Sequence, residues 1–340
     1  MQTISPMSLT LRIGSRPSVL ALAQAAVIKD AITKRLSELV VEIVPISTSG
    51  DKMQTASLAR VGGKGLFIRE LEQALSERRI DVAVHSMKDL PAVLPQQFRI
   101  AAVPRREAPY DVLLSRGRGG WASLPQGARL GTSSVRRRLE ALRVRPDLEV
   151  LPLRGNVDTR LRRLRAGDFD GIILAAAGLR RLGLASDGQN EGAGPSADVT
   201  SMVELDLCDF VPSGGQGALA VEALRDSLPG DSAEIENAIA GLTDLPTLAE
   251  VTAERAFLAT IGASCVSPVG VNGKADNGIL TLRALLFSVD GGRSLSAESA
   301  DELAMVAPNC DQLVQTATQL GERLGRLMLE QGAGELIDRG

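Results

Sequence analysis

Two stretches of the sequence decide the fold: LRIGSRPSVLALAQA at residues 11–25 and ARLGTSSVRRRLEAL at residues 128–142. Each runs from a short apolar segment through a glycine and small polar residues into a helical pattern, which is typical of a strand followed by a helix. Three matched units in the same order indicate a duplication, with generic similarity between βα units as the alternative. The other two matches are VEIVPISTSGD (41–51) with LEVLPLRGNVD (148–158) and DVAVHSMKDLP (81–91) with DGIILAAAGLR (170–180).

The duplication predicts an α/β fold with two related domains around a shared cleft. In such sheets, ligands bind beyond the carboxyl ends of the strands, at helix N-termini. Beyond residue 223 the pattern changes: helical stretches at 233–261 and 310–331 flank alternating runs at 266–290, which indicates a small C-terminal α+β domain. The predicted domains are residues 1–104 plus 204–222, residues 105–203 and residues 223–340.

Composition and charge exclude several classes of function. The chain of 340 residues has a net charge of −3 and only 2% aromatic residues, so we expect no nucleic-acid surface. It has no apolar run of membrane-spanning length, and its first residues lack the features of a signal peptide, so we expect no membrane association. Three scattered cysteines, Cys208, Cys265 and Cys310, favour the reducing cytoplasm over a disulfide framework. With a single histidine, we expect no metal site.

Arginine, serine and threonine residues recur where predicted strands give way to helices. Helix N-termini attract anions, and arginine there opposes the helix dipole, so a bound anion would relieve the arrangement. Guanidinium groups bind carboxylates and phosphates through paired hydrogen bonds. For any single arginine a solvated basic helix face is the better interpretation, but recurrence at four strand ends favours an anion site. The residues at these four strand ends are Ser15, Arg16 and Ser18, then Thr132, Ser133, Ser134, Arg136 and Arg137, then Arg154, Asn156, Thr159 and Arg160, and finally Arg180 and Arg181.

The stretch STSGDKMQTASLARVGGKGLF at residues 47–67 is long, glycine-rich and basic. A loop of about twenty residues in a compact domain is usually functional or disordered. Its glycine pairs and Lys64 suit a lid that closes over an anionic ligand. Lys64 is therefore a candidate contact to such a ligand.

The only histidine lies in VHSMKDL at residues 84–90. Pro91 ends this strand, so Lys88 and Asp89 fall at its carboxyl end while His85 falls inside it. A lone histidine in a strand is usually a hydrogen-bonded structural residue, and no nucleophile–base set accompanies this one. An aspartate among arginines stays ionised and can stabilise a developing cation or move a proton. The alternative for Lys88 and Asp89 is a surface ion pair of little consequence.

Cys265 lies in IGASCVSPVGV at residues 261–271, between a predicted helix and a predicted strand. Its small neighbours leave room around the thiol, which suits a tethering or reactive cysteine. A buried inert thiol is at least equally compatible with the sequence.

Seven motifs together resemble the porphobilinogen deaminase family, also called hydroxymethylbilane synthases. Each motif is weak alone, but they occur in the family's order and spacing from about residue 11 to residue 290. The motifs are RIGSRPSVLALAQ, VGGKGLF, DVAVHSMKDLP, GTSSVRRR, LRGNVDTRL, ILAAAGLRRLG and GGQGALAVE.

The resemblance implies three domains, of which the first two have the periplasmic-binding-protein type II topology and the third carries a cysteine. It implies a dipyrromethane cofactor, made from two substrate units and joined to Cys265 by a thioether. The implied activity is the deamination and head-to-tail condensation of four porphobilinogen molecules, with release of ammonia, followed by hydrolysis to linear hydroxymethylbilane. This is a transferase reaction of tetrapyrrole and haem biosynthesis.

The resemblance also assigns roles to residues. Asp89 aligns with the catalytic aspartate. The cofactor-binding positions align with Cys265, Lys88, Ser134, Arg136, Arg137, Arg154 and Arg160, and the substrate-binding positions with Arg16, Ser18, Lys64, Phe67, Arg154 and Arg181. Residues 263–268, ASCVSP, depart from the family's Gly-Gly-Cys-Gln-x-Pro but keep the spacing of cysteine and proline. Arg60 stands where many members carry lysine, which preserves the charge.

An alternative function is a carboxylate-binding module of the periplasmic-binding-protein type, in which duplicated α/β domains and arginines would look similar. The lack of signal-peptide features counts against a solute receptor, and no helix-turn-helix pattern supports a regulator. The expected partner is the small-molecule substrate alone, and the family leads us to expect a cytoplasmic monomer.

Overall fold

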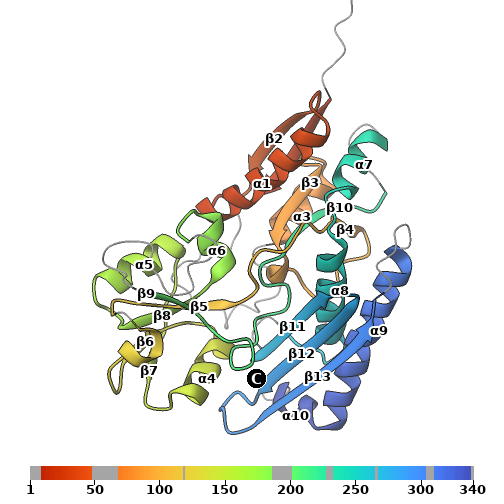
Figure 1. Cartoon of the computed structure of the whole chain (residues 1–340). Coiled ribbons are helices and arrows are strands. Elements are labelled where there is room, and N and C mark those ends of the chain that lie inside the picture. Colours follow the sequence, from red (N-terminus) through yellow and green to blue (C-terminus); the bar gives the residue numbers. More distant parts are fainter. Residues whose placement is uncertain are drawn as a thin grey trace, which may run out of the picture.

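The computed structural model describes residues 9–47, 68–117, 119–185, 201–226, 233–264, 267–303 and 310–337. They form two five-stranded sheets and one three-stranded sheet, with helices packed on each (Figure 1). The arrangement confirms the predicted fold class: two α/β domains of the periplasmic-binding-protein type II arrangement and a small C-terminal α+β domain.

The first sheet has the strand order β2-β1-β3-β10-β4. β1 is parallel to β2 and β3, whereas β10 is antiparallel to β3 and β4. Ile13, Val82 and Val221 of this sheet are fully buried against Ile28 and Ile32 of α1. Because β10 joins this sheet after the chain has built the second one, the chain crosses between the domains twice. The elements are β1 (Thr10–Ser15), α1 (Val19–Arg35), β2 (Val40–Pro45), α3 (Arg69–Ser76), β3 (Val82–Ser86), β4 (Phe98–Ala102), β10 (Leu219–Leu224) and α7 (Ala233–Ala240).

The second sheet repeats this order as β7-β6-β8-β5-β9. β6 is parallel to β7 and β8, and β5 is antiparallel to β8 and β9. β5 thus occupies the place that β10 holds in the first sheet, and each is the first strand after a crossing. The duplication predicted from the matched sequence units is therefore present in the fold. The elements are β5 (Asp111–Ser115), η3 (Gly120–Ser123), β6 (Arg129–Gly131), α4 (Val135–Val144), β7 (Glu149–Leu151), α5 (Val157–Arg165), β8 (Gly171–Ala175), α6 (Ala176–Arg181) and β9 (Ser201–Glu204).

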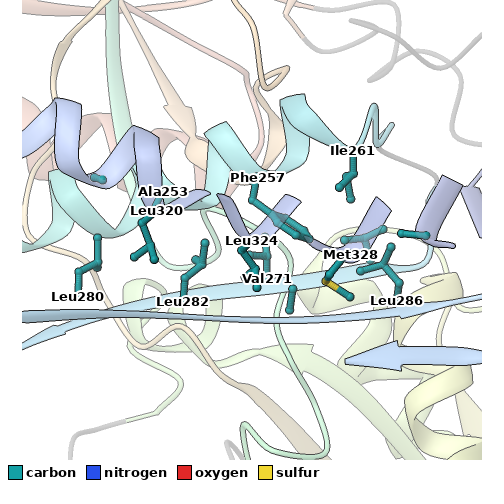
Figure 2. Close-up of a cluster of buried hydrophobic side chains, with 14 of the residues drawn as sticks. Ala253, Phe257, Ile261, Val271, Leu280, Leu282, Leu286, Leu320, Leu324 and Met328 are labelled. Carbon is teal, nitrogen blue, oxygen red and sulfur yellow. The ribbon is translucent and has the colours of Figure 1, made fainter. Parts of the chain in front are cut away.

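The third sheet is an antiparallel meander, and α8, α9 and α10 pack against it (Figure 2). Phe257 of α8, Leu282 of the sheet and Leu324 of α9 are fully buried in their shared core. α9 approaches α8 closely at Gly321, where a Cβ atom would lie 2.2 Å from the carbonyl oxygen of Ala253. The elements are α8 (Leu245–Thr260), β11 (Val269–Asp276), β12 (Ile279–Phe287), β13 (Ser294–Glu302), α9 (Cys310–Glu330) and α10 (Ala333–Ile337).

The helical stretch expected at 233–261 is two helices. Asp244 accepts a hydrogen bond from the backbone N–H of Thr247 at 3.1 Å, and a proline occupies the first turn of α8, so a new helix begins there. α7 packs on the first sheet through Ile235 and Ile239. β13 adds a strand beyond the alternating runs expected at 266–290. The domain boundaries themselves stay predictions.

The two segments that connect the first and second domains run side by side. The first connecting segment is residues 103–110 and the second is residues 205–218. The backbone N–H of Glu107 donates to the carbonyl of Gly217 at 3.1 Å, and a Cβ atom at Gly217 would lie 2.2 Å from the carbonyl oxygen of Glu107. Buried Glu254 of α8 accepts from Arg106 at 2.7 Å and from the N–H of Gly215 at 2.5 Å. All three domains are therefore joined at the crossing, which is the region where residues 103–110 and 205–218 lie side by side.

Candidate active site

Three helices begin at the carboxyl ends of parallel strands with a polar capping residue. Ser18 follows β1 and accepts from the N–H of Ala21 at 3.3 Å. Ser134 follows β6 and accepts from the N–H of Arg137 at 3.4 Å. Asn156 follows β7 and caps α5 in the same way. These turns place positive helix ends where each sheet was expected to bind ligands.

Lys88 and Asp89 lie in a single turn of 3-10 helix, η2 (Met87–Asp89), directly after β3. The turn fits tightly on the second connecting segment, because a Cβ atom at Gly215 would lie 2.9 Å from the backbone nitrogen of Lys88. Lys88 is half-buried, and burial together with the charge of Arg137 lowers its pKa to about 8. Asp89 is exposed, and its carboxylate has no hydrogen bond or ion pair within the part of the chain that the structure describes. The lysine is held by the protein, whereas the aspartate faces solvent.

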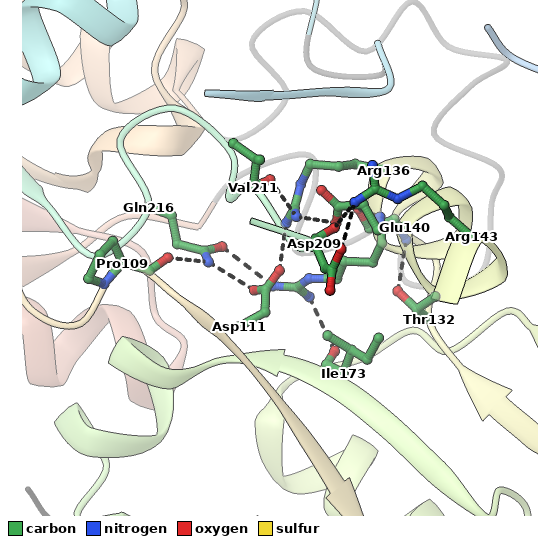
Figure 3. Close-up of polar contacts among 12 residues, drawn as sticks. Pro109, Asp111, Thr132, Arg136, Glu140, Arg143, Ile173, Asp209, Val211 and Gln216 are labelled. Atoms are coloured by element: carbon green, nitrogen blue, oxygen red, sulfur yellow. Dashed lines mark hydrogen bonds and ion pairs between the residues drawn. The ribbon is translucent and has the colours of Figure 1, made fainter. Parts of the chain in front are cut away.

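Asp111, at the start of β5, lies between two arginines of α4 (Figure 3). Its carboxylate accepts from Arg136 at 2.9 Å and from Arg137 at 2.7 Å. Burial alone would raise the pKa of Asp111, but the charges and hydrogen bonds of the two arginines lower it well below its usual range. Arg136 also donates to Glu140 at 2.7 Å and to the carbonyl of Val211 at 2.9 Å. The charge of Arg136 is therefore compensated inside the protein.

Arg160 and Arg181 are half-buried cations of a different kind. Arg160 donates to the carbonyl of Gly155 at 2.8 Å, and Arg181 donates to the carbonyl of Gly217 at 2.6 Å. Among the described residues, neither has a carboxylate within ion-pair distance. Burial lowers the pKa of each to about 10, and the charge of Arg137 adds to the effect at Arg160. A bound anion would stabilise both guanidinium groups.

The remaining predicted anion-binding residues lie at the edges of this region. Arg16 precedes α1 and is half-buried, and Arg154 follows β7 and is exposed. The start of α1 meets α6 of the second domain (Figure 1): a Cβ atom at Gly178 would lie 3.6 Å from the side chain of Leu20. The end of α1 that carries Ser18 therefore faces the helix that carries Arg181.

Three predicted site residues, Lys64, Phe67 and Cys265, lie outside the described residues, as does most of the proposed lid at 47–67. On either side of the cysteine, the N–H of Ser264 donates to the hydroxyl of Ser267 at 3.0 Å. The following strand is bonded to the second connecting segment, because the N–H of Val271 donates to the carbonyl of Pro212 at 2.8 Å. The strand that follows Cys265 in the sequence is therefore bonded to the second connecting segment.

Sequence reasoning missed Gln216 and Asp111. The fully buried amide of Gln216 donates to Asp111 at 2.8 Å and to the carbonyl of Pro109 at 2.7 Å (Figure 3). Its oxygen accepts from Lys88 at 3.3 Å and from Arg137 at 3.4 Å. The GGQGALAVE motif contains this glutamine, and a lone amide between glycines was the available signal. Its partners are far apart in the sequence, so the pattern did not reveal them.

His85 is buried within β3, and its Nε2 lies 2.9 Å from a carboxylate oxygen of buried Glu222 on β10. The contact joins two neighbouring strands inside the first domain. It agrees with a structural position for the only histidine, but among the described residues the Nε2 of His85 makes no hydrogen bond.

None of the helices in the described ranges is long and apolar enough to cross a membrane. Within the same ranges, no cluster of three or more histidine, cysteine or acidic residues could hold a metal ion. The region around the crossing instead combines several cations, helix N-termini and one exposed carboxylate. It suits a ligand that carries several carboxylates.

Two family models match most of the chain. "Porphobilinogen deaminase, dipyromethane cofactor binding domain" matches residues 11–229, and "Porphobilinogen deaminase, C-terminal domain" matches residues 248–330. The chain belongs to the porphobilinogen deaminase family. A porphobilinogen deaminase of Syntrophobacter fumaroxidans is 42% identical over 96% of this chain and 97% of its own length. One of a Roseiflexus species is 44% identical over 84% of this chain and 88% of its own.

Solved structures give weaker likenesses. The periplasmic VFT2 domain of Bordetella pertussis BvgS is 13% identical over 68% of this chain and 86% of that chain, with a TM-score of 0.38. The probable amino-acid ABC transporter extracellular-binding protein ytmK of Bacillus subtilis has the same identity, 13%, and TM-score, 0.38, over 68% of this chain and 89% of that chain. Both likenesses are too weak to support a conclusion, and the fold assignment rests on the strand orders of the two five-stranded sheets.

Family membership confirms the resemblance inferred from the motifs. It also confirms the prediction that the chain is an enzyme, a transferase of porphyrin, haem and tetrapyrrole biosynthesis with a dipyrromethane cofactor. The alternative of a carboxylate-binding module is not favoured. The described residues fit a cofactor that carries carboxylates, because Lys88 and Arg160 are partly desolvated cations that such groups would stabilise.

Proposed function

We propose that the chain condenses four porphobilinogen molecules head to tail on a dipyrromethane joined to Cys265, and then hydrolyses the product to hydroxymethylbilane. The observation that carries this proposal is the group formed by Lys88, Arg160 and Arg181, which are partly desolvated and have no carboxylate within ion-pair distance among the described residues. A pyrrole chain with an acetate and a propionate on every ring supplies such partners. When bound, dipyrromethane supplies the pyrrole carbon at which the chain is extended.

The binding residues come from both α/β domains. We assign Lys88, Ser134, Arg137, Arg154 and Arg160 to the carboxylates of the cofactor and Arg16, Ser18, Lys64, Arg154 and Arg181 to those of the substrate, with Phe67 as an apolar contact to the substrate. Arg136 has a supporting role, because its guanidinium already bonds Asp111, Glu140 and the carbonyl of Val211. It fixes the carboxylate that positions Arg137.

Asp89 is the catalytic residue of the proposal. Its exposed carboxylate follows the half-buried ammonium of Lys88 on the same turn. Loss of ammonia from porphobilinogen leaves a cationic electrophile, which an anionic carboxylate beside it stabilises. The same carboxylate can accept a proton from a pyrrole as the new bond forms.

The test is the rate of porphobilinogen consumption and ammonia release by the purified chain. We expect Asp89→Ala to slow turnover by about 10²- to 10⁴-fold, the usual contribution of a positioned acid–base group, with circular dichroism unchanged. Asp276→Ala, at an exposed carboxylate of the third domain, is the matched control and should be as active as the unmodified chain. Normal turnover by Asp89→Ala would remove Asp89 from the mechanism, and no turnover by the unmodified chain would remove the proposed function.

The proposal extends to the molecule as a whole. It is a cytoplasmic monomer with domains at residues 1–104 plus 204–222, 105–203 and 223–340, and its partner is the small-molecule substrate rather than nucleic acid or membrane. The exposed free thiols of Cys208 and Cys310 support a reducing compartment. Light scattering after size-exclusion chromatography tests the monomer, and a mass of two chains would contradict it.

A further inference from the structure

Gln216 uses every hydrogen-bonding position of its side-chain amide. Its nitrogen donates one hydrogen to Asp111 at 2.8 Å and the other to the carbonyl of Pro109 at 2.7 Å. Its oxygen accepts from the ammonium of Lys88 at 3.3 Å and from the guanidinium of Arg137 at 3.4 Å. An amide has two hydrogens to donate and two lone pairs to accept with, so this side chain is saturated.

The four partners come from different parts of the molecule. Lys88 follows β3 of the first sheet, whereas Asp111 begins β5 of the second sheet and Arg137 lies on α4. Pro109 belongs to the first connecting segment and Gln216 to the second. One buried amide therefore links both domains and both connecting segments.

A charged side chain would not match these partners. A carboxylate at position 216 would have no hydrogen for Asp111 and would lie against it, and a cation would face Lys88 and Arg137. The glycines on either side fix the course of the backbone. A Cβ atom at Gly215 would lie 2.6 Å from the side chain of Met87, and one at Gly217 would lie 2.2 Å from the carbonyl oxygen of Glu107.

We propose that Gln216 is a positioning residue, which holds Lys88 and Arg137 at fixed places on the crossing of the connecting segments so that the cations for ligand carboxylates keep their arrangement across both domains. The inference rests on the proposed function for the identity of the ligand. Gln216 acts through the two cations, and its own side chain is fully buried. Its oxygen is the one side-chain acceptor of Lys88 in the described part of the chain.

The experiment measures the protonation of Lys88 directly. The full-length chain in a Cys265→Ser background, which has no covalent cofactor, is acylated with acetic anhydride over a range of pH, and labelling of Lys88 is followed by peptide mass spectrometry. When residue 216 is glutamine, labelling of Lys88 should be half-maximal at a pH of about 8. Gln216→Glu should raise this midpoint by about one unit, because a carboxylate near an ammonium favours its charged form. Gln216→Met should lower it, because the acceptor is lost.

Opposite shifts from two variants of similar size are a signature that a merely structural role does not produce. Gln73→Glu adds the same charge on an exposed face of α3, where Gln73 donates to Glu77, and should leave the midpoint in place. Circular dichroism identifies any variant that fails to fold. Gln216→Asn, a smaller change, then replaces that variant and should lower the Lys88 midpoint, because its shorter side chain no longer brings the acceptor to Lys88.

The outcomes separate this inference from the proposed function. A Lys88 midpoint unchanged in every folded Gln216 variant would overturn the inference, even if the chain consumes porphobilinogen. Opposite shifts in a chain that consumes no porphobilinogen would support the positioning of Lys88 while removing the proposed function.

Discussion

The arginines of α4 and those of α5 and α6 look alike in the sequence but differ in the structure. Arg136 and Arg137 are buried against the carboxylate of Asp111. Arg160 and Arg181 are partly buried with only backbone carbonyls as described hydrogen-bond partners. Removing the carboxylate from a buried ion pair destabilises a fold, whereas a desolvated cation without a nearby carboxylate would be stabilised by an anionic ligand. The difference separates arginines that are neutralised inside the protein from arginines that an anionic ligand would stabilise.

The largest expected effect is on stability, from Asp111→Asn. The change leaves two buried guanidinium groups without their shared carboxylate, and breaking a buried pair in this way typically costs about 3–5 kcal/mol. Because the pKa of Asp111 is lowered in the folded protein, its stabilisation is present above pH about 4 and is lost as the pH falls further. Urea unfolding of both chains at pH 7 measures the difference.

Asp168→Asn is the control for this measurement. Asp168 pairs with Arg163 at 2.7 Å on the surface, and such pairs contribute about 0–1 kcal/mol. If both variants lost the same free energy of unfolding, the buried pair would contribute no more than a surface pair, and the distinction between the two groups of arginines would be wrong.

Arg160→Gln and Arg181→Gln are expected to have the opposite pattern. Removing a desolvated cation without a carboxylate partner should leave the free energy of unfolding within about 0.5 kcal/mol. In Arg181→Gln the KM for porphobilinogen should rise by about tenfold or more, because hydrogen bonds to charged groups contribute about 1.5–3 kcal/mol. In Arg160→Gln, whose arginine is assigned to the cofactor, a smaller fraction of the purified chain should carry the cofactor. Steady-state kinetics, intact mass and urea unfolding check these predictions, and a large loss of stability with unchanged KM and cofactor content would place both residues with Arg136.

A smaller effect is expected from pH. The pKa of Lys88 in the free enzyme is about 8, so its ammonium is charged below that pH and neutral above it. If it binds a carboxylate, kcat/KM should fall as the pH rises through about 8. Lys88→Arg keeps its charge throughout this range, so its profile should lack this alkaline fall. The same fall in both chains would assign the titration to another group.

The position of the site could be predicted from the sequence because its signals are local. Proline and small polar residues mark where strands end, and the strand-end rule then puts Ser18, Lys88, Asp89 and Ser134 at neighbouring helix starts. The structure has those turns where they were expected. The roles assigned to these residues stay predictions.

The division among the arginines could not be predicted, because it depends on distant partners. Asp111 lies 25 residues before Arg136, and Gln216 lies 79 residues after Arg137. No local pattern says which arginine will meet a carboxylate and which will not. β13 was missed for a different reason: its SLSAESADE sequence alternates without large apolar residues beyond Leu295, since one face of this edge strand is open to water.

The most direct test of the account is the intact mass of the purified chain. Lys88 and Arg160 are proposed to hold the carboxylates of a dipyrromethane on Cys265, so the mass should exceed the sequence mass by two linked pyrrole units. Cys265→Ser should remove the addition, whereas Cys208→Ser and Cys310→Ser should keep it. A chain that turns over porphobilinogen at its plain sequence mass, or one that keeps the addition without Cys265, would contradict the account.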